Sequence, residues 1–212
     1  MVIFLTLGLV WLIIELVRVF LLWKKNRRAL SALVKSQEEL GYLSFIFSEV
    51  FAQKYPVEVI FPKLLNRLRE SLGWTYHSIF RLDEERQLMI VRFTGYLPDW
   101  YMEKFSTKVL VKVGDAAIGR AVSTSQPVII NASIVDPRFK SVTQVAQQTG
   151  YKSLTCCPMI GRLKVYGGFC AYSQYENIFT LHDSQFLLTC AYLYGAILET
   201  ILLQEYLKKK DK

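Results

Sequence analysis

The sequence lacks the groups of residues from which most enzyme and metal sites are built. It contains two histidines, His77 and His182, and four cysteines, no two of which have the C-x-x-C spacing of zinc sites. It also has no Gly-rich phosphate-binding loop, no paired carboxylates and no recognisable Ser/His/Asp set. These absences predict no metal ion, no cofactor and no enzymatic activity. A single histidine can hold haem, so the small number of histidines and cysteines argues less strongly against haem than against other cofactors.

Positive charge is scarce in the middle of the chain, although the formal net charge is +8. Four basic residues within 24–28 contribute +4 and residues 208–212 contribute +3, which leaves about +1 for the rest. A protein that binds nucleic acid needs basic charge spread over a face of its domain. The near-neutral middle of the chain therefore excludes DNA and RNA as expected partners.

The N-terminal residues form a long apolar run. As a helix, residues 2–23 would reach about 33 Å, enough to cross a lipid bilayer. No basic residue precedes the run and "KKNRR" follows it, which is the reverse of a cleaved signal peptide. The positive-inside rule then predicts a single-pass membrane protein whose remaining domain faces the cytoplasm. A helix buried inside the protein is the alternative interpretation.

Two charged residues, Glu15 and Arg18, interrupt this apolar run. Their spacing of three places them on one face of a helix, where they can pair. Arg18 is also close enough to the basic flank to extend toward the membrane interface. Two interpretations follow: the charges neutralise each other, or Glu15 contacts a partner helix inside the membrane.

The remaining chain predicts an α+β domain without an internal repeat or a low-complexity linker. We expect an anchor over 1–23, a basic flank and connecting helix over 24–39, a folded domain over 40–206 and a basic tail over 207–212. Runs rich in β-branched and aromatic residues predict strands at 75–82, 87–94, 108–113, 126–130, 153–159 and 164–173. Helices are expected at 29–51, 57–72, 116–125, 140–149 and from 180 to about 206.

The last helix has a clear predicted start and two apolar faces. Thr180 and Asp183 have the spacing of a capping box. One apolar stripe contains Phe186 and Leu193, and a second contains Leu187 and Tyr194. A helix that covers a sheet needs one stripe. The second stripe therefore predicts another partner, most simply the same helix in a homodimer.

Several segments, taken in order, resemble a GAF domain. The strongest element is Gly114 to Arg120, followed by "QPV" at 126–128 and "DPR" at 136–138. The segments "TGYKSLTCCPMI", "VYGGFCAYS" and "FTLHDSQFLLTCAYLYGAIL" complete the pattern, so that the resemblance covers roughly residues 40–205. It implies a GAF/PAS-like antiparallel sheet of about six strands, flanked by helices and preceded here by the transmembrane helix. Helices on one side would mediate dimerisation, and a small-ligand pocket would lie on the other.

The resemblance also implies a function. GAF domains typically act as sensory or regulatory modules for small molecules and pass the signal to an attached output domain. No output domain is recognisable after residue 205, so the signal is expected to leave through a partner signalling or membrane protein, or through the anchor. Some members attach bilins through a cysteine followed by histidine, which none of the four cysteines has. Asn131 stands where many members carry an aspartate.

The implied pocket supplies the candidate ligand-binding residues. Asp136, Arg138 and Tyr151 are the expected ligand contacts, with Ser153 and Cys157 in the wall. The alternative is that Asp136 caps a local turn and pairs with Arg138.

A different class of function follows if side chains fill the pocket. Phe93, Tyr101, Phe139 and Phe169 are the expected fillers, and the protein would then be a structural or assembly factor of a membrane complex. A cavity of about 300 Å³ or more would favour ligand sensing, and a packed interior would favour assembly.

Adjacent Cys156 and Cys157 fall in the middle of a predicted strand. Neighbouring strand residues point to opposite faces, so a bridge between the two would be strained. We interpret both as reduced, buried apolar side chains. Free methionine sulfoxide reductases are single GAF domains with cysteines in the covering loops, and the corresponding loops here contain none. A thiol-based oxidoreductase similar to these reductases is the one enzymatic alternative, and the lack of cysteines in the covering loops argues against it.

Overall fold

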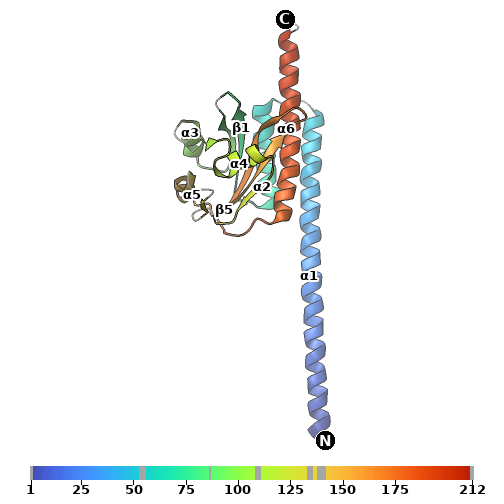
Figure 1. The fold of residues 1–212 in the computed structure, drawn as a ribbon. Helices are drawn as coiled ribbons and strands as arrows, with labels where there is room; N and C mark the ends of the chain where they lie inside the picture. Colours follow the sequence, from blue (N-terminus) through green and yellow to red (C-terminus); the bar gives the residue numbers. More distant parts are fainter. Residues whose placement is uncertain are drawn as a thin grey trace. The chain divides into compact units, whose positions relative to one another are not determined.

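The structure is a computed structural model that describes residues 2–52, 56–85, 87–107, 111–132, 136–137 and 142–210. The chain divides into two compact units, residues 1–41 and 42–212. The first unit is the N-terminal part of a continuous helix, α1 (Val2–Ala52) (Figure 1). The predicted anchor and connecting helix both fall within α1. Side chains of residues 1–13, about half of the predicted anchor, lie outside the described residues.

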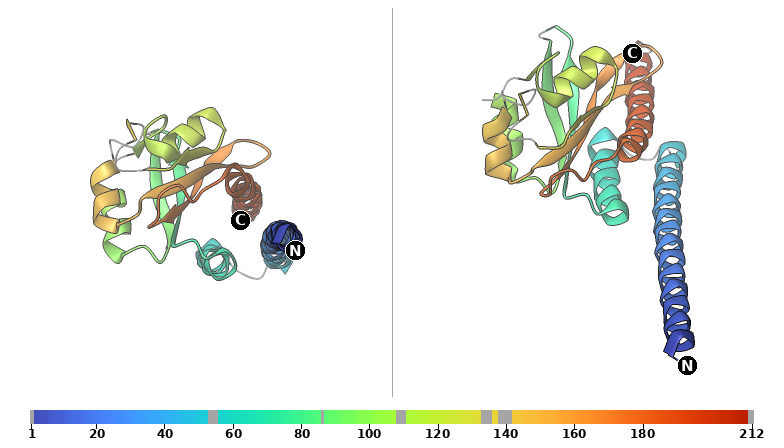
Figure 2. Two further views of the ribbon diagram at one scale, coloured as in Figure 1. Left: turned by 90° about the horizontal axis from the view of Figure 1, so that it is seen from below. Right: turned by 60° about the horizontal axis from the view of Figure 1, so that its bottom comes forward.

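The second unit is built on a six-stranded antiparallel sheet, as predicted (Figure 2). Its order is β3-β2-β1-β6-β5-β4, so the two longest-paired hairpins, β1–β2 and β5–β6, meet in the middle. The strands are β1 (Tyr76–Asp83), β2 (Leu88–Gly95), β3 (Val111–Lys112), β4 (Val128–Ile130), β5 (Ser153–Ile160) and β6 (Val165–Ser173).

Helices cover both faces of this sheet. The segment of α1 from Tyr42 onward packs on one face together with two long helices, α2 (Val57–Leu72) and α6 (Leu181–Lys210). The other face carries α3 (Asp99–Thr107), α4 (Ala116–Thr124) and α5 (Thr143–Thr149). We call these the long-helix face and the short-helix face. The fold is thus the expected α+β arrangement of a sheet between helices.

Alternation along the two central strands supplies both cores. On β5, Cys156 belongs to the core of the short-helix face and Cys157 to that of the long-helix face. On β6, Cys170 and Tyr172 lie on the short-helix face, whereas Phe169 lies on the opposite one. Both faces are buried, so these strands carry apolar side chains at successive positions instead of alternating with polar ones. The prediction that the adjacent cysteines point to opposite faces is confirmed.

The start of α6 has the predicted capping box. The Asp183 carboxylate accepts hydrogen bonds from the backbone N–H of Thr180 at 2.8 Å and from its hydroxyl at 2.5 Å. In return, the backbone N–H of Asp183 donates to Thr180 Oγ1 at 3.2 Å. These reciprocal bonds satisfy N–H groups that a helix start otherwise leaves without partners.

Two glycines let helices approach the sheet closely. A Cβ atom on Gly195 of α6 would lie 2.6 Å from the carbonyl oxygen of Ile160 on β5, so the helix rests directly on strand backbone. A Cβ atom on Gly168 of β6 would lie 2.0 Å from the Cδ1 atom of Ile118 on α4. The close seat of α4 narrows the space between it and the sheet.

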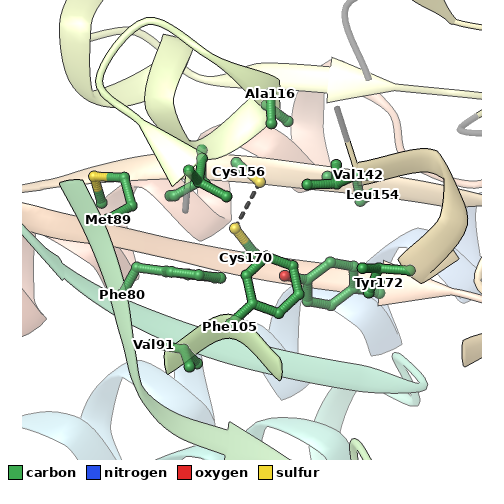
Figure 3. Close-up of a cluster of buried hydrophobic side chains, with 14 of the residues drawn as sticks. Phe80, Met89, Val91, Phe105, Ala116, Val142, Leu154, Cys156, Cys170 and Tyr172 are labelled. Atoms are coloured by element: carbon green, nitrogen blue, oxygen red, sulfur yellow. Dashed lines mark hydrogen bonds between the residues drawn. The ribbon is translucent and has the colours of Figure 1, made fainter. Parts of the chain in front are cut away.

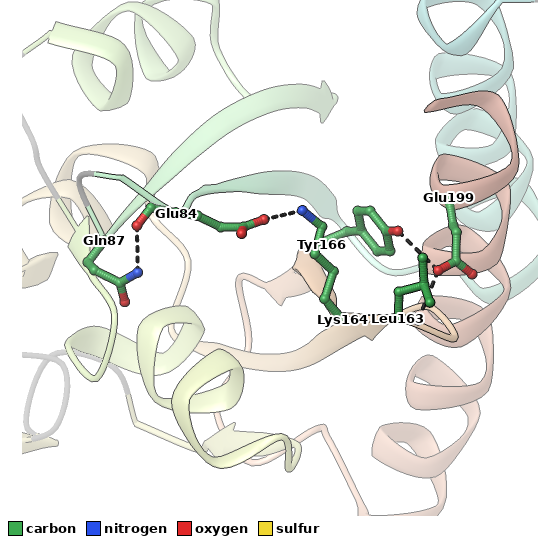
Figure 4. A network of polar contacts seen from close by, with 6 residues as sticks. All are labelled: Glu84, Gln87, Leu163, Lys164, Tyr166 and Glu199. Carbon is green, nitrogen blue, oxygen red and sulfur yellow. Dashed lines mark hydrogen bonds and ion pairs between the residues drawn. The ribbon is translucent and has the colours of Figure 1, made fainter. Parts of the chain in front are cut away.

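A single carboxylate ties the β5–β6 turn to α6 (Figure 4). Glu199 accepts hydrogen bonds from the backbone N–H groups of Arg162 and Leu163, both at 2.9 Å, and from the Tyr166 hydroxyl at 3.1 Å. The first of these backbone donors does most to lower the pKa of Glu199 below its ordinary value. Lys164, on the same turn, pairs with Glu84 at the tip of the neighbouring hairpin.

One described helix has the length and composition to cross a membrane, namely α6 over Leu181–Gln204, with a mean hydropathy of 1.8. Half of this window is buried in the second unit, against β5 and β6. Packing in the core is therefore a sufficient reason for its apolar composition. Leu187 and Tyr194 of the second predicted stripe are buried within this chain, so the inference that this stripe needs a second chain was wrong.

Two elements differ from the sequence-based expectation. Strand β3 is limited to Val111–Lys112. Val113 already belongs to a turn, and residues 108–110 of the predicted range lie outside the described residues. Helix α3 was not expected at all. It begins after Pro98 with Asp99 in its first turn, a composition that suits a helix N-terminus.

Candidate functional site

The candidate site is a small, nearly filled cavity between the sheet and helices α3 and α4 of the short-helix face, and Figure 3 shows side chains of its wall. Its volume is about 20 Å³, room for roughly one water molecule. Strands β1, β5 and β6 supply one wall, and α3 and α4 supply much of the other. Aromatic rings occupy most of the space around it, and these are Phe80, Tyr101, Phe105, Tyr151 and Tyr172.

These rings pack on one another in one connected cluster, in which the centroids of Tyr101 and Tyr172 lie 6.4 Å apart. The centroid of Phe105 lies 4.5 Å from that of Tyr101 and 5.6 Å from that of Phe80, the latter edge to face. The centroids of Tyr151 and Tyr172 are 4.7 Å apart. Ring pairs at these distances attract one another beyond their burial. Helix α3, absent from the sequence-based expectation, brings in both Tyr101 and Phe105.

A short polar network links two of the three tyrosine hydroxyls of this aromatic cluster. The Tyr172 hydroxyl forms hydrogen bonds with Ser78 Oγ at 2.7 Å and with the Tyr101 hydroxyl at 3.0 Å. Burial raises the pKa of both tyrosines well above the ordinary value, so they stay neutral hydrogen-bonding groups. The network orders the rings and carries no charge that would attract an ionic ligand.

Two thiols complete the wall of the cavity. Cys156 and Cys170 are directly opposite each other on β5 and β6, and their Sγ atoms lie 2.6 Å apart (Figure 3). Both are buried. Burial, followed by the contact with Cys170, raises the pKa of the Cys156 thiol. The thiol form therefore predominates at Cys156 at neutral pH.

The predicted site residues are only partly brought together. Tyr151 lines the cavity. Cys157 instead faces α6, where its Sγ lies 3.5 Å from the Ser184 carbonyl oxygen, so the cysteines in the wall are its neighbour Cys156 and Cys170. Ser153 does not line the cavity either, because its hydroxyl donates to the Tyr175 carbonyl oxygen at 2.6 Å.

The remaining candidates lie in the loop that follows β4. The backbone N–H of Asp136 donates to the Ala132 carbonyl oxygen at 3.1 Å, which closes a local turn. Arg138 lies outside the described residues, as does Phe139. Of the other expected pocket fillers, Tyr101 is in the cavity wall, whereas Phe93 and Phe169 pack on the long-helix face. Within the described part of the chain, no three His, Cys, Asp or Glu side chains cluster as metal ligands would.

A larger cavity, which the sequence did not indicate, opens on the long-helix face. It measures about 160 Å³ and lies between α2, α6 and the sheet. Its lining is mostly apolar, with Phe61 and Leu198 from the two helices. Arg81 and Arg92 from the sheet and Glu58 from α2 add charged groups.

Sheet order, helices on both faces and a cavity under the short helices define a general sensory, ligand-binding fold. The sequence profile of the GAF domain family matches residues 56–198, about two thirds of the chain, and the chain therefore belongs to the GAF domain family. No curated protein sequence matches it significantly.

Solved structures with the same fold come from proteins of different kinds. The GAF domain of a phosphoenolpyruvate-protein phosphotransferase from Coxiella burnetii aligns with a TM-score of 0.68 at 20% identity, covering 80% of this chain and 98% of that one. Free methionine-R-sulfoxide reductase from Neisseria meningitidis aligns with a TM-score of 0.61 at 16% identity, covering 76% of this chain and 88% of that one. A GAF domain region of a putative membrane protein from Geobacter sulfurreducens aligns with a TM-score of 0.56 at 15% identity, covering 74% of this chain and 98% of that one. At these identities the likeness concerns the fold alone.

Proposed function

We propose that this protein is a membrane-anchored module whose GAF domain, with its filled pocket, acts through contact with another protein chain, as expected of an assembly factor of a membrane complex, and turns over no substrate. The observation that carries the proposal is the filled state of the cavity on the short-helix face. Five aromatic side chains leave about 20 Å³, whereas sites for small organic ligands measure about 300–1,000 Å³. A protein contact needs no such space.

Membrane attachment is supported by the described side chains of the first unit. From Ile14 to Trp23 the apolar side chains are each more than half exposed, on all sides of α1. A helix that is apolar all round suits a lipid environment. Glu15 and Arg18 pair at 3.5 Å, which supports the interpretation that the two charges offset each other in lipid. The basic residues after Trp23 support a cytoplasmic GAF domain.

Pairing with a second chain is supported by the last turns of α6. Leu202, Leu203, Tyr206 and Leu207 are each at least 45% exposed. A homodimer formed through these turns would bury them. The same surface suits a helix of a partner signalling or membrane protein, which is the alternative outcome of the test below.

Native mass spectrometry of the full chain in detergent micelles tests the proposal. We expect two copies per complex and no stoichiometric small molecule after gentle release from the micelle. A retained organic ligand would contradict the proposal that the domain acts without a small ligand, and a monomer at all protein concentrations would contradict the homodimer. Membrane anchoring is tested separately by alkaline extraction of membranes. The full chain should stay in the pellet, and a variant that lacks residues 1–23 should be released.

A further inference from the structure

The cavity wall contains a pair of cysteines placed for covalent linkage. Cys156 and Cys170 are direct partners in the β5–β6 ladder, and both side chains lie on the short-helix face. Directly opposite residues of antiparallel strands have Cα atoms about 4.5–5.5 Å apart, within the 4.4–6.8 Å that disulfides span. The Sγ atoms are 2.6 Å apart, and an S–S bond measures about 2.05 Å. Bond formation therefore needs no rearrangement of the sheet.

The other two cysteines cannot compete for this pair. Cys157 and Cys190 belong to the core of the long-helix face, on the far side of the sheet from Cys156 and Cys170. Cys157 is next to Cys156 in the chain, but the strand turns its side chain away. The geometry selects one pair among four buried thiols.

The cavity determines which oxidant can reach the two sulfurs. Cys156 and Cys170 both line the space of about 20 Å³, which has room for a molecule little larger than water. Hydrogen peroxide satisfies this limit. A glutathione disulfide or a protein disulfide does not, because the aromatic rings around the cavity would have to leave the core.

We propose that Cys156 and Cys170 form a peroxide-responsive dithiol site in the wall of the GAF cavity. One thiol loses its proton and attacks a peroxide oxygen, so that an S–O bond forms, the O–O bond breaks and one water is released. The second thiol then attacks the resulting sulfenic acid, an S–S bond forms and a second water leaves. In sum, two thiols and one hydrogen peroxide give one disulfide and two waters, and the two sulfurs supply the two electrons.

The disulfide would link two strands that are already neighbours in the fold. It would close a loop that includes the β5–β6 turn and would therefore stabilise the oxidised protein mainly by restricting its unfolded chain. The reaction is expected to be slow, because buried thiols are poor nucleophiles. The site thus suits a response to sustained peroxide rather than rapid peroxide removal.

Two double variants of the full chain, purified in detergent micelles, test this proposal. Cys157→Ala/Cys190→Ala keeps only the proposed pair, and Cys156→Ala/Cys170→Ala is its matched control with the same number of thiols. Each is treated with hydrogen peroxide while folded, then unfolded and alkylated, and its intact mass is measured. Circular dichroism before treatment verifies that each variant is folded.

On treatment with peroxide, the Cys157→Ala/Cys190→Ala variant should lose the mass of two hydrogen atoms. It should then take up no alkylating agent, and reduction should restore both thiols. Its thermal midpoint should rise on oxidation by on the order of 10 °C. The control should keep two alkylatable thiols. The proposal is overturned if the pair stays reduced under peroxide that oxidises the unfolded chain, or if both variants form a disulfide equally. Should a variant fold poorly, the unmodified chain decides: two of its four thiols must be lost together.

Discussion

The two faces of the sheet differ in how completely side chains fill the space beneath their helices. On the short-helix face, aromatic rings interlock, their hydroxyls bond to one another, and about 20 Å³ stays open. On the long-helix face, a cavity of about 160 Å³ lies beside two arginines, and both ring nitrogens of the buried His77 have no hydrogen-bond partner among the described residues. The face that a GAF fold usually opens to a ligand is here the better packed of the two. On the long-helix face, the helices leave a larger cavity and buried polar atoms without hydrogen-bond partners among the described residues.

The largest expected effect comes from the same truncation made on both faces. Phe169→Ala removes a fully buried ring from the long-helix face and should lower the free energy of unfolding by about 3–5 kcal/mol. Phe105→Ala on the short-helix face should cost less, because Phe105 sits on the nine-residue helix α3, which can shift toward the sheet, whereas Phe169 lies on the central strand β6. Chemical denaturation of both variants measures the difference. Equal losses would remove the contrast that we draw between the faces.

Stability at mildly acidic pH should depend on His77. Burial, aided by the positive charge of Arg69, lowers the pKa of His77 from 6.5 to about 3. The unfolded chain therefore takes up the proton first as the pH falls. The contribution of the neutral His77 to the free energy of unfolding is complete above pH 6.5. Below pH 6.5 this contribution falls by about 1.4 kcal/mol per pH unit, down to the pKa of His77 in the folded protein. Denaturation curves between pH 7 and pH 5 should show this slope. His77→Leu should flatten it, and His182→Ala, at an exposed position, should leave it unchanged.

Glu199 provides an intermediate test of the long-helix face. Glu199→Gln keeps the shape of the side chain but weakens three hydrogen bonds from the β5–β6 turn, and we expect a lower melting temperature. The lowered pKa adds a pH dependence. The contribution of the carboxylate is present above the ordinary glutamate pKa and is lost as the pH falls through the folded value. A melting temperature that falls equally in the variant and the parent below pH 5 would argue against this role.

The smallest expected effect concerns the hydroxyl network of the short-helix face. Tyr172→Phe removes the group that joins Ser78 and Tyr101 and should cost about 0.5–1.5 kcal/mol. The ring itself stays in place, so its packing on Tyr151 is unchanged. Tyr76→Phe, outside this network on a half-buried residue that accepts from Gln174, is the matched control. A loss no greater than that of the control would mean that the network contributes little.

Local sequence signals predicted much of the fold because they act over a few residues. The capping box at Thr180 and Asp183 was readable from spacing alone, and the strands from runs of β-branched and aromatic residues. Helix α3 has a short amphipathic pattern over nine residues and gives a weak periodic signal. Because helix α3 was not predicted, its contribution of Tyr101 and Phe105 to the cavity wall was not predicted either.

The site was less predictable because it depends on which strands become neighbours. The sequence draws attention to Cys156 and Cys157, which are adjacent, but the pairing of β5 with β6 places Cys170 opposite Cys156. Alternation along β6 was a usable signal: Phe169 and Cys170 must point to opposite faces, so both cannot fill the same pocket. How closely α4 approaches the sheet depends on Gly168 and Ile118, which are far apart in the sequence.

The Glu199 carboxylate has a mechanical consequence. Three donors from one hairpin, two in its turn and one on β6, converge on this side chain, so α6 cannot slide along its axis unless those bonds break or the hairpin travels with the helix. The strands of that hairpin carry Cys156 and Cys170. Tension applied to the C-terminal end of α6 would therefore reach the β5–β6 hairpin, and a bond between its two strands would make that hairpin stiffer.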